Sequence, residues 1–428
     1  RNDGNKFGGE GLSILGAYGY GPTLLTNLTF LNHIQPSPAL YGGSLKTWNG
    51  GPYLVKGCVF RDNLNKDGGA IYAYNGTNGY VISDSTFVGN TGKRAGAVHF
   101  LNEKNQTMPN NIITRCNFSN NVVDGPGGAI YTDFNLLSMV NTTFSSNSAS
   151  GRAATAQGGA IFGTETSVID LENVRFLSNH ANGKGGAIHL ELGSKVLLRG
   201  TEMRNNVAVL AGGGISTSKS TIEFQPSNFQ TALVANTVES SYVADGGDGS
   251  PHGVGGGICG EGMTLSYFDP KAVITKNTAA RGGGLFSADT FLVFDRVGGY
   301  PLGNTATDTG VDIFVSETSA APVIACPAGR YFDRSDPRLS GPVLTGACQA
   351  CPPGKHQSSP FSFACGVCSV GRSNSGTGKE ECSDCLVGKF SNETGLTECY
   401  SCPFGETSSI KGGVSCQKCQ AGRYGDGI

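Results

Sequence analysis

The sequence is poor in charge. Charged side chains make up only 15% of the 428 residues, and the formal net charge is −2, whereas ordinary soluble domains carry about 25% charged residues. No basic tract occurs, so nucleic acid is not an expected partner. No apolar run approaches the roughly 18 residues of a membrane-spanning helix, so no membrane span is expected in this segment. Because the chain begins at Arg1 rather than Met, the lack of a signal peptide carries no weight.

Glycine is abundant, and much of it lies in a repeated motif. The 66 glycines are about twice the usual share of roughly 7%. The stretch FRDNLNKDGGAIY, residues 60–72, contains the two halves of the motif, F-x-x-N and G-G-A-I. The apolar residue that ends the second half recurs at Leu45, Ile71, Val98, Ile130, Ile161, Ile188, Ile215, Ile258, Leu285 and Ile313. The asparagine of the first half recurs at Asn63, Asn90, Asn121, Asn147, Asn179, Asn206, Asn236, Asn277 and Asn304. Most steps are 26 to 32 residues long, and a fixed period of this size predicts a solenoid.

The segments between the motifs are short and alternate in polarity, which is the pattern of strands. We therefore expect an all-β fold, a parallel β-helix solenoid of about ten rungs followed by a disulfide-rich, loop-rich repeat array. At roughly 4.8 Å per rung, ten rungs make a rod about 50 Å long. The expected domains are the β-helix at 1–315, a linker at 316–325 and the cysteine-rich repeats at 326–428.

Each repeated residue has a structural role in such a rung. The phenylalanines should stack in one inward column, and the asparagine three positions later should turn the chain and bond to the asparagines above and below. The paired glycines suit a turn where stacked rungs leave little room for a Cβ. The column phenylalanines are Phe60, Phe87, Phe118, Phe144 and Phe176.

The paired motifs over roughly residues 40–315 resemble the passenger domains of the chlamydial polymorphic outer-membrane proteins, which form β-helices. Related repeats look common in secreted proteins of eukaryotes, especially protists. A cysteine-rich segment follows the repeats here. What the resemblance implies is therefore the rod, and not the biology of a bacterial autotransporter.

The cysteines are concentrated after the repeats. All of the 14 cysteines except Cys58, Cys116 and Cys259 lie between Cys326 and Cys419. After Cys326 they form C-x-x-C pairs with a strict period of 17 residues, and similar phrases such as CLVGKFS follow the second cysteine of each pair. C-x-x-C pairs also occur in zinc sites, but an open array with few apolar residues fits disulfides better.

This array resembles the ephrin-receptor-like cysteine-rich repeats of extracellular proteins. Connectivity cannot be read from sequence alone, but the phrase pattern favours local loops. The expected disulfides are Cys326–Cys348, Cys351–Cys365, Cys368–Cys382, Cys385–Cys399 and Cys402–Cys416. Cys419 is left without a partner, which suggests that the chain is a fragment of a longer protein. Cys58 and Cys116 lie two rungs apart, too far to bridge, so Cys58, Cys116 and Cys259 are expected to be buried free thiols.

N-glycosylation sequons accompany the dense cysteines and point to the eukaryotic secretory pathway and an extracellular or cell-surface location. The sequons are at Asn27, Asn75, Asn105, Asn117, Asn141 and Asn392. Asn117 and Asn141 lie an odd number of positions before an inward phenylalanine, so both should face solvent.

Few residues suggest a cofactor or catalysis. One swollen rung, residues 217–257, contains ADGGDGSPHGVGGG, whose Asp245 and Asp248 are weak evidence for calcium. No other cofactor is expected. Parallel β-helices also host polysaccharide lyases and hydrolases, which need clustered carboxylates. The acids here are scattered along the sequence, with no recurring pair on one outward column, so an enzyme is not expected. They include Asp133, Asp170, Glu172, Glu191 and Asp312.

One column could carry an interaction. The residue after each G-G-A-I motif neighbours an inward Ile, so the column should face outward, either as an aromatic ladder that shields a sheet or as a contact stripe for a subunit or a glycan. The column holds Tyr72, His99, Tyr131, Phe162, His189, Phe286 and Phe314.

The sequence therefore favours a non-catalytic extracellular structural protein, the subunit of a cell-surface or flagellar-appendage filament, for example a hair of a protist flagellum. Open strand edges and outward aromatics would suit self-association or contact with other filament or cell-surface proteins. The alternative is an adhesin or receptor ectodomain that binds glycans or proteins. A polysaccharide lyase or hydrolase is the third possibility.

Overall fold

The structure is a computed structural model, and it contains strands and turns but no helix in the residues described. The chain divides into two compact units. One comprises residues 1–291, 298–322 and 338–344, and the other comprises 292–297, 323–337 and 345–428. The described residues are 6–7, 12–15, 22–34, 43–65, 67–76, 78–104, 107–241, 243, 252–267, 271–288, 291–294, 303–309, 312–315, 324–326, 328–333, 339–340, 347–358 and 364–422.

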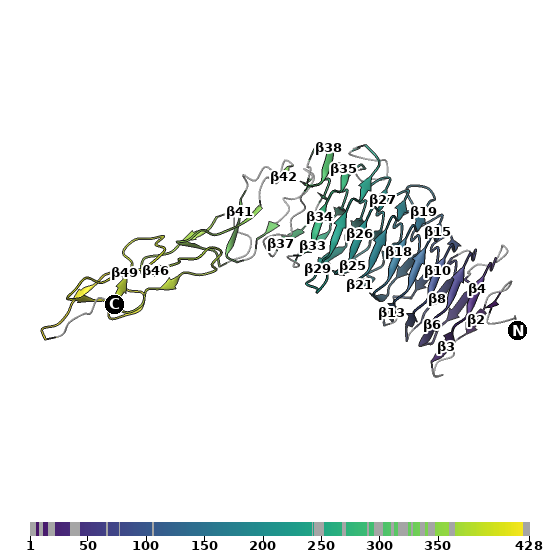
Figure 1. The fold of residues 1–428 in the computed structure, drawn as a ribbon, viewed down its shortest axis with the longest axis horizontal. Coiled ribbons are helices and arrows are strands. Elements are labelled where there is room, and N and C mark those ends of the chain that lie inside the picture. The colour runs from purple at the N-terminus through teal and green to yellow at the C-terminus, as the bar shows by residue number, and fades with distance from the viewer. Residues whose placement is uncertain are drawn as a thin grey trace. The chain divides into compact units, whose positions relative to one another are not determined.

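The first unit is a stack of parallel strands in a solenoid of about nine turns (Figure 1). One turn runs through β9 (Tyr80–Ser83), β10 (Thr86–Val88), β11 (Thr91–Gly92) and β12 (Val98–Leu101). Each strand pairs in parallel with its counterpart one turn away, for example Phe87 with Phe60 and with Phe118. The predicted fold class is confirmed.

The F-x-x-N motif lies on a 10-stranded sheet. Its phenylalanine rings are fully buried and stacked, with centroids 4.5 Å apart for Phe87 and Phe118 and 4.9 Å apart for Phe144 and Phe176. The strands are β1 (Lys6–Phe7), β4 (Thr29–Leu31), β7 (Val59–Arg61), β10, β14 (Asn117–Ser119), β18 (Thr143–Ser145), β22 (Arg175–Leu177), β26 (Glu202–Arg204), β30 (Ala232–Val234) and β34 (Val273–Thr275).

Short strands follow the asparagines and form an 8-stranded sheet. Its members are β11, β15 (Val122–Val123), β19 (Ser148–Ala149), β23 (His180–Ala181), β27 (Val207–Ala208), β31 (Thr237–Val238), β35 (Thr278–Arg281) and β38 (Thr305–Thr309).

The G-G-A-I motif leads into a 12-stranded sheet. Its members are β2 (Leu12–Leu15), β5 (Leu45–Trp48), β8 (Ile71–Tyr74), β12, β16 (Ile130–Asp133), β20 (Ile161–Thr164), β24 (Ile188–Leu190), β28 (Ile215–Ser218), β32 (Ile258–Glu261), β36 (Leu285–Ala288), β39 (Ile313–Val315) and β42 (Leu339–Ser340).

The fourth ladder has 11 strands and alternates buried and partly exposed side chains, as in β21, where Ile169 and Leu171 are buried. Its members are β3 (Thr23–Thr26), β6 (Tyr53–Lys56), β9, β13 (Asn110–Thr114), β17 (Leu136–Val140), β21 (Val168–Glu172), β25 (Lys195–Arg199), β29 (Thr221–Phe224), β33 (Thr264–Tyr267), β37 (Phe291–Phe294) and β40 (Ile324–Ala325). The strand β40 lies inside the segment 316–325 that the sequence predicts as a linker.

The asparagines of the motif form a continuous buried ladder. The backbone N–H and the Nδ2 of Asn90 both donate to Oδ1 of Asn121, at 3.0 and 2.9 Å, and Nδ2 also donates to the Phe60 carbonyl at 3.0 Å. The same three bonds repeat along the solenoid. The ladder starts where His33 N–H donates to Asn63 and ends where Asn304 donates twice to the Asp312 carboxylate. Every polar atom of the asparagine side chain is thus satisfied inside the core.

The motif glycines are required by close approach between turns. A Cβ on Gly128 would lie 1.8 Å from the Gly159 carbonyl oxygen, a distance that no side chain tolerates. Alanine at such a position would separate neighbouring turns, which explains why both glycines recur with the period.

The cysteine-rich segment contains antiparallel hairpins and disulfides. Four of the five expected bonds are present, Cys351–Cys365, Cys368–Cys382, Cys385–Cys399 and Cys402–Cys416. Cys326 is also disulfide-bonded, while the side chain of its expected partner Cys348 lies outside the described residues. The hairpins are β41 (Arg330–Asp333) with β43 (Ala347–Ala350), β44 (Lys355–His356) with β45 (Gly366–Val367), β46 (Arg372–Ser373) with β47 (Ser383–Asp384), β48 (Lys389–Phe390) with β49 (Tyr400–Ser401), and β50 (Glu406–Thr407) with β51 (Gln417–Lys418).

The remaining cysteines are free. Cys58, Cys116 and Cys259 are buried, and Cys419 is partly exposed. Burial raises the pKa of the Cys116 thiol to about 11, so this thiol stays protonated and behaves as a small apolar side chain at neutral pH.

We predict that Asn147→Ala destabilises the β-helix by about 3 kcal/mol, because it leaves the two Asn121 donors without their acceptor in the core. The measurement is urea unfolding followed by circular dichroism. The control is Asn110→Ala at an exposed position of β13, which should change stability by less than about 0.5 kcal/mol. Equal effects of the two substitutions would contradict a stabilising ladder.

Candidate functional site

The column that the sequence predicts as an outward interaction stripe is buried, so that prediction is wrong. The exposed fraction is 0% for Tyr72 and His99, 4% for Phe162 and 7% for Phe314. His189 and Phe286 are likewise buried, and Tyr131 is half-buried. The column makes a ladder of ring contacts, with centroids 5.2 Å apart for Tyr72 and His99. The neighbouring contacts continue through Tyr131, Phe162 and His189, and Phe286 contacts Phe314.

The ladder is covered by the chain that leads into each strand of the 12-stranded sheet. Ala211 and Val254, from these connections, pack in one cluster with Cys259, Phe286 and Phe314. The Arg281 guanidinium lies 5.2 Å from the centre of the Phe314 ring. Strand alternation therefore placed the aromatic column on the correct side of the sheet. That side is not exposed to solvent, because the connections fold across it.

Two histidines lie inside this ladder, and Nε2 of His189 lies 4.0 Å from Oε2 of Glu191. Neither nitrogen of His99 has a partner among the described residues, nor has Nδ1 of His189. Burial, with a smaller contribution from Arg94, lowers the pKa of His99 to about 3. Burial and Lys184 do the same to His189. Both rings are therefore neutral at physiological pH and act as aromatic members of the ladder.

Acidic side chains gather near this sheet, although the sequence suggested that they are scattered. Glu165 pairs with Lys104 at 2.5 Å, and the Thr164 hydroxyl donates to Glu191 at 3.3 Å. Burial and then Glu165 raise the pKa of the Asp133 carboxyl to about 6. Sequence reasoning missed this group because Asp133, Glu165 and Glu191 come from three successive turns. No group of three or more His, Cys, Asp or Glu side chains that could hold a metal occurs in the described part of the chain.

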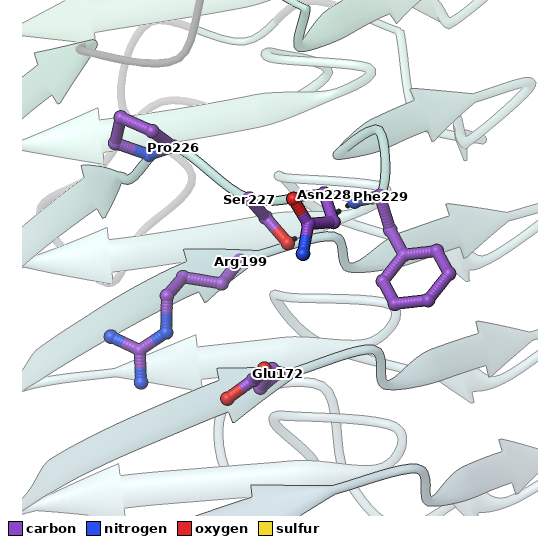
Figure 2. A pocket seen from close by; sticks show the side chains of 6 residues that line it. All are labelled: Glu172, Arg199, Pro226, Ser227, Asn228 and Phe229. Atoms are coloured by element: carbon purple, nitrogen blue, oxygen red, sulfur yellow. Dashed lines mark hydrogen bonds between the residues drawn. The ribbon is translucent and has the colours of Figure 1, made fainter.

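A hollow of about 420 Å³ lies at a corner of the solenoid (Figure 2). Glu172 ends β21 and Arg199 ends β25, and the two residues are partners across these paired strands. The rest of the lining comes from the connection between β29 and β30. We call this site the corner hollow, and its lining residues are Glu172, Arg199, Pro226, Ser227, Asn228 and Phe229.

The side chains of the corner hollow differ in whether they already make hydrogen bonds within the protein. Arg199 donates two bonds to Asp170, at 2.5 and 2.6 Å, and one to Gln225 at 2.9 Å. Neither the Glu172 carboxylate nor the side-chain amide of Asn228 has a hydrogen-bond or ion-pair partner among the described residues. Phe229 is 55% exposed. Figure 2 shows its ring standing at the side of the hollow opposite Pro226.

The sequons differ in accessibility. Asn27, Asn117, Asn141 and Asn392 are exposed, as expected for Asn117 and Asn141. Asn75 is only 4% exposed and accepts a hydrogen bond from the Glu103 N–H, so it is not available to carry a glycan in this fold. Asn105 lies outside the described residues, as do Asp245 and Asp248 of the suggested calcium loop.

We predict that acid destabilises the β-helix through His99 and His189. The unfolded histidine titrates near 6.5 and the folded one near 3, so the unfolded state binds protons first. The stability from the neutral rings is complete above pH 6.5 and is lost as the pH falls towards 3. Asp133 acts oppositely, because its folded pKa is raised to about 6. The measurement is the urea midpoint between pH 8 and pH 4.

The double variant His99→Phe and His189→Phe should lose less stability over this pH range than the unmodified chain, since the ladder already contains Phe162 and Phe286. His180→Phe, at a half-buried position of β23, controls for an added ring and should keep the original pH profile. An unchanged profile in the double variant would show that the buried histidines do not cause the acid sensitivity.

Comparisons with known proteins agree with this architecture. The model of the Chlamydia polymorphic membrane protein repeat matches residues 115–133, 141–164 and 173–191. The model described as tyrosine-protein kinase ephrin type A/B receptor-like matches residues 371–419. A probable autotransporter, YfaL of Escherichia coli strain K12, is 28% identical over 263 residues, which is 52% of this chain and 20% of that protein. The chain thus spans about a fifth of the length of this relative.

Within the described part of the chain, no helix is long and apolar enough to cross a membrane. Three repeat matches on β-strand turns and one match on the disulfide array agree with both resemblances that the motifs indicate. The parallel β-helix of this chain is therefore similar to the Chlamydia polymorphic membrane protein repeat over residues 115–133, 141–164 and 173–191, and its cysteine-rich segment is similar to the ephrin-receptor-like model over residues 371–419.

Proposed function

We propose that this chain is the ectodomain of a cell-surface or secreted protein of the adhesin type, which binds glycans or proteins with the side of its β-helix. The observation that carries the proposal is the occurrence, in one chain, of polymorphic membrane protein repeats and an ephrin-receptor-like segment, together with the similarity to a probable autotransporter. The disulfides support an oxidising, extracellular setting.

A non-catalytic filament subunit is the second candidate. The strand edges at the ends of a β-helix favour it, because such edges must be capped or paired. Its other support was the aromatic stripe, whose residues are buried except for the half-buried Tyr131, so the stripe offers little surface to a neighbouring subunit. The side of the β-helix, including the corner hollow, remains as a surface for contacts, and this favours the adhesin.

The proposal predicts that beads coated with the full chain are retained on the surface of eukaryotic cells more strongly than beads coated with albumin. Treatment of the cells with periodate or trypsin should reduce retention, depending on whether the ligand is a glycan or a protein. Electron microscopy of the same preparation tests the second candidate. Polymers without retention would replace the adhesin by the filament, and absence of both would refute the two functions together.

Passage through a eukaryotic secretory pathway predicts a selective glycan pattern. When the chain is expressed as a secreted protein in eukaryotic cells, glycans should be found at Asn117 and Asn141 and not at Asn75, because the Asn75 side chain is buried. Peptide mass spectrometry after enzymatic deglycosylation in water enriched in oxygen-18 measures the occupancy. An occupied Asn75, or unoccupied Asn117 and Asn141, would contradict the prediction.

A further inference from the structure

The corner hollow lies where the solenoid departs from its own repeat. In most turns a single left-handed residue joins the 11-stranded to the 10-stranded sheet, for example Asn173 (φ 51°) and Gly200 (φ 55°). In the next turn Phe224 still pairs with Leu198, and Ala232 pairs with Glu202. Between these two pairs, residues 226–230 occupy the position that the single residue Gly200 occupies one turn earlier. The repeat itself does not need this insertion.

The inserted loop is fixed at both ends. A Cβ on Gly200 would lie 2.6 Å from Cβ of Phe229, so the loop rests directly on the backbone of the turn below. Gln230 Nε2 donates to the Lys271 carbonyl at 2.8 Å, and the Phe229 N–H donates to Ser227 Oγ at 3.3 Å. The loop therefore holds Phe229 in place although this residue is 55% exposed. Such preorganisation lowers the entropic cost of binding.

The lining has the chemistry of a sugar site. One face of the Phe229 ring offers an apolar platform for the C–H groups of a pyranose. Glu172 is an acceptor of hydroxyl hydrogens, and Asn228 is both a donor and an acceptor. Arg199 is held by Asp170 and Gln225, which leaves its remaining N–H groups with a fixed direction. A volume of about 420 Å³ falls within the roughly 300–1,000 Å³ of small-molecule sites.

The charges of the corner hollow select the kind of sugar. The positive charge of Arg199 is balanced by Asp170 at 2.5 Å, so the carboxylate of Glu172 leaves the site with a net negative charge. A negative site repels uronic acids, sialic acids and phosphates. Neutral hexoses and N-acetylhexosamines are not repelled.

We propose that the corner hollow is a binding site for a neutral sugar ring, a hexose or N-acetylhexosamine of a cell-surface glycan, stacked on Phe229 and hydrogen-bonded by Glu172, Asn228 and Arg199. The proposal rests on the proposed function and gives it a ligand class and a place in the fold. Phe229 contributes the platform, and Glu172 excludes acidic sugars.

The test is saturation-transfer NMR and titration calorimetry on the full chain, with methyl glycosides of glucose, galactose, mannose and N-acetylglucosamine, and with glucuronate and sialic acid as acidic probes. At least one neutral glycoside should bind, and Phe229→Ala should weaken it roughly tenfold. Glu172→Gln should reduce the preference for neutral over acidic sugars. Phe404→Ala is the matched control, since it removes the aromatic ring of a residue in the cysteine-rich segment that is 89% exposed.

Each outcome decides the proposal. Absence of binding by all four neutral glycosides, or binding that survives Phe229→Ala, overturns the corner hollow as a sugar site. Thermal unfolding of every variant tests whether the fold is intact. We expect an unchanged fold in Phe229→Ala, because Phe229 lies in an exposed loop. Beads coated with the Phe229→Ala variant distinguish a failure of the sugar site from a failure of the proposed adhesin function. If they are retained on cells as strongly as the unmodified chain, the adhesin stands and its ligand, a protein or another glycan, binds elsewhere.

Discussion

The hydrogen bonds between asparagines of successive turns hold the register of this protein. An Asn in one turn has a single place in which its backbone N–H and its Nδ2 both reach Oδ1 of the next, as Asn121 does with Asn147 at 3.1 and 2.9 Å. The phenylalanine rings three residues earlier are then brought into stacking contact, and the G-G pair must pass over the turn beside it. A shift by one residue would expose the rings and bury the unpaired amides, so the polar ladder and the apolar core enforce one another.

The sequence was sufficient for this part of the structure because its determinants are local and repeated. Phe60, Asn63 and the glycines that follow recur with a period, and the period identifies the fold. It was not sufficient for Tyr72 and the column above it. Strand alternation says which side of a sheet a residue occupies, but whether that side is wet depends on where the connections run, as Val254 and Arg281 show. Charge pairs such as Lys104 with Glu165 are equally invisible, because they join residues from different turns.

The corner hollow illustrates a signal that sequence reasoning could have used. The motif asparagines Asn179 and Asn206 are 27 residues apart, whereas Asn206 and Asn236 are 30 apart, and the longer step contains the loop at 226–230. In a solenoid, the repeated positions are committed to stacking. The residues free to acquire a binding role are those that interrupt the period. A search for the repeat does not detect these residues, because they occupy no repeated position. Departures from the period are therefore worth reading as carefully as the motif.

The asparagine ladder also has a direction. Each asparagine offers two N–H donors towards the turn that comes later in the chain and receives two from the turn before, so a partly formed rod ends in unsatisfied donors at its C-terminal side. An incoming turn supplies the acceptor that these donors lack. The folded part can therefore act as a template on which the chain is added turn by turn from the N-terminus, in the order in which a chain is synthesised. The last acceptor is the Asp312 carboxylate rather than another amide, and because it has no Nδ2 to offer a further turn, the asparagine ladder ends there.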